Sequence, residues 1–132
     1  MTTTWGALRQ VSQRAIDIDR AAAFYEQTLG LRLIARFGPL AFFDLDGVRL
    51  FLSTGEGGDA GPGSVLYLAV DDIVAARAGL EAKGVEFVDE PQVLFVDEAG
   101  TFGTAGEAEW MTFFRDSEGN LLALSSRERH PK

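Results

Sequence analysis

The sequence predicts an α+β fold of two βαβββ modules that form a curved, cup-shaped mixed sheet with the helices on the outside. The first observation is an amphipathic helical segment at residues 17–30, of which residues 72–84 are a weaker copy. The second is that short β-rich segments follow both helices. The third is that the last hairpin of the first half returns near the end of the chain. Together they indicate one structural unit used twice.

The first half begins with a predicted strand over residues 8–16, which leads into the first helix. In this helix the apolar residues share one face, at positions i, i+3, i+4, i+7 and i+11: Ile18, Ala21, Ala22, Tyr25 and Leu29. Asp17 is placed to cap the first free N–H groups, and Gly30 to end the helix in a left-handed conformation.

Three strands should follow the first helix, over residues 31–35, 40–45 and 48–53. The first two are separated by a loop that contains proline. The last two are joined by Asp46-Gly47, which is the strongest short hairpin signal.

In the second half we expect the same order after a glycine-rich connection. A strand over residues 64–70 leads into the helix at 72–84, for which Asp71 is the expected cap and Gly84 the expected end. The strands that follow are expected over these ranges: 85–88, 92–96, 110–115 and 121–125. The surplus segment, residues 97–109 with Phe102, is interpreted either as a lid over a site or as a mobile surface loop.

The repeat becomes concrete when the ends of the halves are overlaid with a shift of 72 residues. Six pairs are then identical: Phe42/Phe114, Asp44/Asp116, Gly47/Gly119, Leu50/Leu122, Leu52/Leu124 and Ser53/Ser125. Each half has too little core to be stable alone. We therefore expect a single domain over residues 1–132, with module one at 7–54, a linker at 55–63 and module two at 64–127.

Composition limits the function. No apolar run reaches the length of a membrane span, and the N-terminus lacks the layout of a signal peptide, so we expect a soluble, cytoplasmic protein. The lack of such a run also argues against a membrane partner. The absence of cysteine excludes disulfides and thiolate metal sites. The formal net charge of −8 makes nucleic acid an unfavourable partner and would attract a cationic small molecule, although it is also explained by solubility alone.

Three segments resemble one known family: DIDRAAAFYEQTLGL at 17–31, VDDIVAARAGLEAKGVEF at 70–87 and WMTFFRDSEGNLLALS at 110–125. They resemble the vicinal oxygen chelate superfamily, which includes glyoxalase I, extradiol dioxygenases, methylmalonyl-CoA epimerases and bleomycin-resistance proteins. The resemblance implies a homodimer that binds a small molecule. One scaffold in this superfamily hosts many reactions, so the resemblance does not fix the chemistry.

The resemblance also implies where metal ligands would lie. Relatives that use a metal carry ligands on the first and last strand of each module, and the corresponding residues here are Gln10, Phe51, Val65 and Ala123. Three of these side chains have no lone pair to offer, and a lone glutamine is a weak ligand. The only histidine, His130, lies in the charged tail RERHPK, which is expected to be a solvated terminus. We therefore expect no metal and no cofactor.

Strand alternation places further side chains on the same inner faces. Ser12, Ser53, Tyr67 and Ser125 follow from this rule, and the pairing of Ala41 with Phe113 under the shift of 72 suggests that Phe113 and Met111 also face inward. The predicted ligand-binding residues are Gln10, Ser12, Phe51, Ser53, Val65, Tyr67, Met111, Phe113, Ala123 and Ser125. Alternatively, the aromatic residues only fill the core.

The sequence thus predicts a metal-free small-molecule-binding protein, which would sequester a hydrophobic or cationic compound such as an antibiotic. The alternative is an isomerase or lyase resembling glyoxalase I or methylmalonyl-CoA epimerase with relocated catalytic residues. Its general base would be a loop carboxylate or Tyr67. A third option is a structural or regulatory relative with a collapsed cup.

Overall fold

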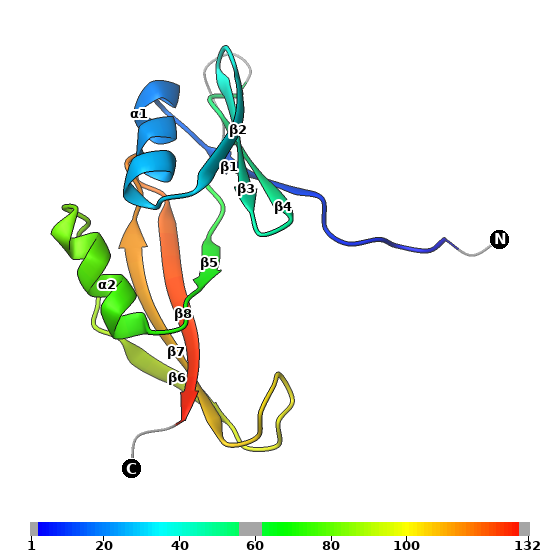
Figure 1. Ribbon diagram of the computed structural model, residues 1–132, viewed down its shortest axis with the longest axis vertical. Coiled ribbons are helices and arrows are strands. Elements are labelled where there is room, and N and C mark those ends of the chain that lie inside the picture. The colour runs from blue at the N-terminus through cyan, green and yellow to red at the C-terminus, as the bar shows by residue number, and fades with distance from the viewer. Residues whose placement is uncertain (1–2, 56–61, 130–132) are drawn as a thin grey trace. The chain divides into compact units, whose positions relative to one another are not determined.

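The computed structural model describes residues 3–55 and 62–129. The chain divides into two compact units, residues 1–64 and 65–132, which we call module one and module two. Each has a four-stranded mixed sheet with a helix against it, in the order βαβββ, so the predicted fold class is confirmed (Figure 1). In the described part of the chain, no helix is both long enough and apolar enough to span a membrane. Most of the predicted linker, residues 56–61, lies outside the described residues.

The sheet of module one has the strand order β1-β4-β3-β2. Its strands are β1 (Gln10–Arg14), β2 (Arg32–Phe37), β3 (Leu40–Leu45) and β4 (Val48–Ser53). The pair β1–β4 is parallel and the other pairs are antiparallel. Asp46 and Gly47, with φ of 51° and 94°, form the predicted two-residue hairpin between β3 and β4.

The first helix, α1 (Ile18–Ala23), continues as a π-helical turn over Phe24–Thr28. Asp17 caps it as predicted, because its Oδ1 accepts the N–H of Arg20 at 3.1 Å. Gly30 has φ 76° and turns the chain into β2. Tyr25, in this π-helical turn, packs against Phe43 of β3, with ring centroids 6.1 Å apart.

The core of module one lies between this helix and one face of its sheet. Its members are buried side chains that alternate along the strands with exposed or half-buried ones: Gln13, Ala15, Ala21, Ala22, Tyr25, Ala41, Phe43, Leu50 and Leu52. Gln13 is satisfied within this core, since its amide binds both the N–H and the C=O of Ser64, at 2.7 and 2.8 Å. The opposite face of the sheet has no helix of module one on it; we call it open face one.

Module two repeats this arrangement in the order β5-β8-β7-β6. Its elements are β5 (Leu66–Ala69), α2 (Ile73–Ala82), β6 (Gln92–Asp97), β7 (Glu107–Arg115) and β8 (Leu121–Arg129). Leu122, Leu124, Thr112 and Phe114 are buried on the side of α2. The opposite face of this sheet is called open face two.

Three local predictions in module two are wrong. Residues 85–88 do not form a strand, because only Phe87 bridges to the sheet, at Phe114. The cap of α2 is Asp72 rather than Asp71, since Asp72 Oδ1 accepts the N–H of Ala75 at 3.0 Å. The last hairpin is longer than predicted: Arg127–Arg129 belong to β8, so half of the expected solvated tail is strand. His130 lies outside the described residues.

The strand registers also correct the predicted overlay of the two halves. Phe42 pairs with Phe51 in module one, and Phe113 pairs with Ala123 in module two, so Phe42 corresponds to Phe113 rather than to Phe114. The shift of 72 holds for β4 and β8 but is 71 for β3 and β7. Eight residues separate Phe42 from its partner Phe51, whereas nine separate Phe113 from its partner Ala123, which explains the difference.

Candidate functional site: the open faces of the two sheets

Open face one carries all four of the residues predicted for module one. Along β1 these are Gln10 and Ser12, and along β4 they are Phe51 and Ser53. Ser12 pairs with Phe51 in the parallel ladder, and both alternate with residues that point to the helix. Gln10 and Ser12 are exposed, whereas Phe51 and Ser53 are half-buried.

An aromatic cluster that the sequence analysis missed lies in the middle of this face. Phe42 stacks on Phe51, with centroids 5.0 Å apart and an interplanar angle of 20°. Phe37, which is 62% exposed, meets Phe42 edge to face at 5.9 Å. The guanidinium carbon of Arg49 lies 5.8 Å from the centre of the Phe42 ring, and Arg49 Nε donates to Gln10 Oε1 at 2.6 Å.

Open face two carries five of the six residues predicted for module two. Tyr67 pairs with Ala123, which pairs with Phe113, and Ser125 pairs with Met111. Tyr67 is 58% exposed and meets Phe113 edge to face at 6.2 Å. The sixth predicted residue, Val65, precedes β5 and is 44% exposed.

Phe113 lies on the same sheet face as Ala123, but the reason given for this placement was wrong. Ala41, its predicted counterpart, is fully buried on the helix side of module one. Phe113 faces the open side because it pairs with Ala123 in the β7–β8 ladder. Trp110, which differs in parity from Met111, lies on the opposite face.

One end of open face two holds a network of ion pairs around Arg127. Its guanidinium binds Asp97 at 2.9 Å, Glu109 at 3.0 Å and Glu107 at 3.3 Å. Glu109 also accepts a hydrogen bond from Ser125 Oγ at 2.9 Å. The side chains of Asp97 and Arg127 are 3% and 22% exposed, so the network is shielded from solvent on most sides.

This network alters the pKa of both partners. Burial raises the pKa of Asp97, but hydrogen bonds from the N–H groups of Phe102 and Thr101 and from Arg127 outweigh it and hold the pKa below its ordinary value of 3.8. The hydrogen bond to Asp97 in turn raises the pKa of Arg127, against the opposing effect of burial. Both groups are charged at neutral pH.

The segment interpreted as a lid or a mobile loop is partly strand. Residues 97 and 107–109 belong to β6 and β7, so only 98–106 connect the two strands. Asp97 holds this connection through the N–H groups of Thr101 and Phe102, at 2.7 and 2.9 Å. Phe102 is 71% exposed and meets Phe95 edge to face at 5.6 Å.

The residues at the metal-ligand positions of the family do not fit a metal ion. Phe51, Val65 and Ala123 have no donor atom, and the amide oxygen of Gln10 already accepts a hydrogen bond from a cation, Arg49. Within residues 3–55 and 62–129, no group of three or more His, Cys, Asp or Glu side chains is arranged to hold a metal.

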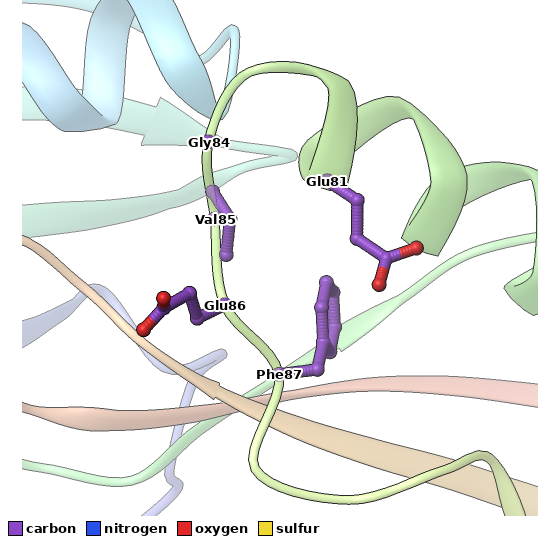
Figure 2. A pocket seen from close by; sticks show the side chains of 5 residues that line it. All are labelled: Glu81, Gly84, Val85, Glu86 and Phe87. Carbon is purple, nitrogen blue, oxygen red and sulfur yellow. The ribbon is translucent and has the colours of Figure 1, made fainter.

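A shallow hollow lies on the helix side of module two, at the end of α2. Figure 2 shows the side chains of Glu81 and Phe87 around the space between the helix and the segment that follows it. The full lining is Glu81, Gly84, Val85, Glu86 and Phe87. None of the predicted ligand-binding residues takes part, and no cation lines it, so the two open faces remain the better candidates.

The fold and these faces define a two-module βαβββ protein with aromatic sheet surfaces. The family model of the Glyoxalase/Bleomycin resistance protein/Dioxygenase superfamily matches residues 7–124, and the chain belongs to this superfamily. The comparison with curated proteins finds no match.

Solved structures share the fold at low identity. An integron cassette protein from V. cholerae is 21% identical, with a TM-score of 0.71 over 96% of this chain and 98% of that chain. A superfamily member from Sphaerobacter thermophilus is 22% identical, with a TM-score of 0.71 over 92% and 98%. A lactoylglutathione lyase from Agrobacterium tumefaciens is 19% identical, with a TM-score of 0.67 over 93% and 95%. At these identities the likeness concerns the fold alone.

Proposed function

We propose that this chain is a small-molecule-binding member of the superfamily that holds its ligand on the open sheet faces without a metal ion. The observation that carries the proposal is the pairing of Gln10 with Arg49 beside the rings of Phe42 and Phe51. Of the two family ligand positions in module one, only Gln10 has an atom that could bind a metal, and this atom, Oε1, already accepts a hydrogen bond from Arg49. The surroundings instead favour a ring-shaped ligand with few polar groups.

The sequence left a hydrophobic and a cationic ligand open, and the local charges favour a hydrophobic one. The net charge of −8 attracts cations only at long range. On open face two, three carboxylates already share the guanidinium of Arg127, so they are poorly placed to bind a second cation. Sequestration of a hydrophobic antibiotic-like compound is the form of the proposal that these contacts support.

Metal analysis and a ligand screen test the proposal together. Purified protein should contain no stoichiometric divalent ion, and addition of Mn²⁺, Ni²⁺ or Zn²⁺ should not change its melting temperature. In a thermal-shift screen, flat hydrophobic compounds should raise the melting temperature more than cationic glycopeptides, since a ligand that binds only the folded state stabilises it. A tightly bound stoichiometric metal would overturn the proposal.

The Gln10→Ala variant connects this screen to the site. It should weaken any hit, because the face then loses the amide N–H groups of Gln10 and Arg49 loses the partner that fixes its position. Gln27→Ala, which changes the same residue type in the turn after α1, serves as a control. Unchanged binding by Gln10→Ala would remove open face one from the proposal.

The proposal includes a homodimer in the cytoplasm. The superfamily resemblance implies the dimer, and one face of each sheet carries no helix of its own module. Sedimentation velocity at micromolar concentration tests it, and a monomer at all concentrations would contradict it. Fractionation of cells that express the protein tests the location.

A lyase or isomerase activity is the second function that the sequence left open. Tyr67 is exposed on β5 and is therefore accessible to a substrate, but no carboxylate of the described residues forms a hydrogen bond with its hydroxyl. We place binding first for this reason. Turnover of a ligand found in the screen, abolished by Tyr67→Phe, would reverse the order.

A further inference from the structure

Arg49 is a cation that open face one presents to solvent. It lies at the start of β4, directly opposite Gln10 in the parallel ladder, and its side chain extends over the Phe42 ring. Its Nε donates to Gln10 at 2.6 Å, and the backbone N–H of Arg49 donates to Arg9 O at 2.9 Å. The ring below and the amide beside it hold the guanidinium in one orientation.

The outer edge of this guanidinium is available. Within residues 3–55 and 62–129, no carboxylate lies within ion-pair distance of Arg49, and Gln10 is the only side chain that accepts a hydrogen bond from it. Arg32, on the neighbouring part of the same sheet, has a different environment because it pairs with Asp44 at 3.6 Å. Asp44 lies directly opposite Arg49 in the β3–β4 ladder, but its carboxylate pairs with Arg32 instead, so Arg49 forms no ion pair among the described residues of its module.

A guanidinium with two free amino groups matches one class of ligand group. Its planar fork binds a carboxylate through two parallel hydrogen bonds, and such charge-assisted bonds are stronger than neutral ones. The rings of Phe42 and Phe51 lie nearly parallel beside it, at 20° to each other. A flat ring attached to the carboxylate would lie against this aromatic pair.

We propose that open face one binds a flat aromatic or conjugated carboxylate, with the carboxylate on Arg49 and the ring on Phe42 and Phe51. The inference rests on the proposed function, since it names the ligand class of the same site. The proposed ligand is therefore an anion, whereas the acidic composition suggested a cation. A short-range ion pair with Arg49 outweighs the long-range field of the net charge, because salt screens that field. Gln10 acts as a positioning residue for the guanidinium.

Three naphthalene compounds that share a ring and differ in charge test this assignment. They are 2-naphthoate, 2-naphthylmethanol and 2-naphthylmethylammonium, each titrated into the full-length protein by calorimetry in 50 mM salt. The carboxylate should bind about tenfold or more tightly than the alcohol, because a hydrogen-bonded charge pair adds to the same ring contact. The ammonium compound should bind most weakly.

Two variants assign the preference to one side chain. Arg49→Met keeps the length of the side chain but removes the charge, so it should abolish the preference for the carboxylate and leave binding of the alcohol unchanged. Arg36→Met is the matched control, since it also removes one positive charge from the same sheet, from a side chain that pairs with Asp19 at 2.9 Å, and should change the affinity for the carboxylate less than about twofold. Arg49→Lys should restore part of the preference, because it returns the charge without the fork.

The outcomes separate this inference from the proposed function. If the alcohol or the ammonium compound binds as tightly as the carboxylate, or if Arg49→Met keeps the preference, the inference is overturned while a binding function stands. If neither the three compounds nor any compound of the wider screen changes the melting temperature of the wild-type protein, the inference and the proposed function both fail.

Discussion

The last strand of each module carries an arginine on its open face, and the two arginines have opposite surroundings. Arg127 of β8 contacts three carboxylates and is 22% exposed. Arg49 of β4 has one neutral partner, Gln10, and a phenyl ring. The two arginines lie at opposite ends of these strands, Arg49 at the start of β4 and Arg127 near the end of β8. Arg127 stabilises its module through ion pairs, whereas the charge of Arg49 is available to a ligand. An arginine without an ion-pair partner among the described residues therefore marks the better candidate for ligand recognition.

The aromatic residues show a second difference between the two faces. In module one the ladder partners are Ser12 and Phe51, whereas in module two the corresponding partners are Tyr67 and Ala123. The large aromatic residue lies on the last strand in module one, as Phe51, and on the first strand in module two, as Tyr67. In both modules it contacts the same residue of the middle strand, Phe42 or Phe113. Exchange of a large and a small residue across a ladder preserves volume, so both faces keep one aromatic pair.

The largest expected effect on stability concerns the buried phenylalanine that each module has in its core. Phe43 and Phe114 occupy corresponding buried positions and are both fully shielded from solvent. Replacing either with alanine should cost about 3–5 kcal/mol of stability, since the loss of ring contacts adds to the cavity that remains. Urea unfolding of the two variants checks this, with Val74→Ala at an exposed helix position as the control. A cost below about 1 kcal/mol for one variant would show that its module has the weaker core.

The next effect separates the two arginines. Arg127→Met should lower the melting temperature clearly, because it leaves the buried carboxylate of Asp97 and those of Glu107 and Glu109 without their counter-charge. Arg49→Met should leave the melting temperature nearly unchanged, since it breaks one exposed hydrogen bond. Differential scanning fluorimetry of both variants measures the contrast. Equal shifts would contradict the assignment of a structural role to Arg127 alone.

A smaller effect depends on pH and arises from module two. The pKa of Asp97 is lowered in the folded state, so its contribution to stability is fully present at neutral pH. It is lost as the pH falls below the ordinary value of 3.8 and through the lower folded value. Urea unfolding from pH 7 to pH 2 should show that wild type and Asp97→Asn converge only at the acidic end. A difference that stays constant down to pH 2 would exclude this role of Asp97.

The smallest expected effect concerns the start of α2. Asp72→Ala should cost about 1 kcal/mol, because the N–H of Ala75 loses its acceptor. Asp71→Ala is the matched control and should change stability by less than about 0.5 kcal/mol, as expected for a surface substitution. Chemical denaturation of both variants makes the comparison. A larger loss of stability for Asp71→Ala than for Asp72→Ala would instead identify Asp71 as the cap.

The sequence was sufficient for the architecture because local signals and the repeat agreed. The face of α1, its cap Asp17, its end at Gly30 and the Asp46-Gly47 hairpin are all encoded by neighbouring residues. Residues 85–88 were misassigned because their β-rich composition satisfies the propensity of a strand without providing a ladder. The predicted overlay was wrong by one residue in β7, because it was fixed by identical residues around the two turns and did not allow for the extra residue of the second hairpin.

The candidate site was predicted only in part. Alternation correctly grouped Gln10, Ser12, Phe51 and Ser53, and the same rule carried one step further along β4 would have reached Arg49. Alternation beyond Ser125 would likewise have reached Arg127, which was set aside as part of a charged tail. That Arg127 is neutralised and Arg49 is not depends on contacts between distant residues. Such contacts cannot be read from spacing along the chain.

The most direct test of ligand binding on open face one is a titration of ¹⁵N-labelled protein with 2-naphthoate, followed by amide chemical shifts. The account predicts that the shifts change first around Gln10, Phe42, Arg49 and Phe51, and that Arg49→Met suppresses these changes. Changes confined to the hollow at Glu81–Phe87, or spread over module two with Arg49→Met behaving as wild type, would contradict it.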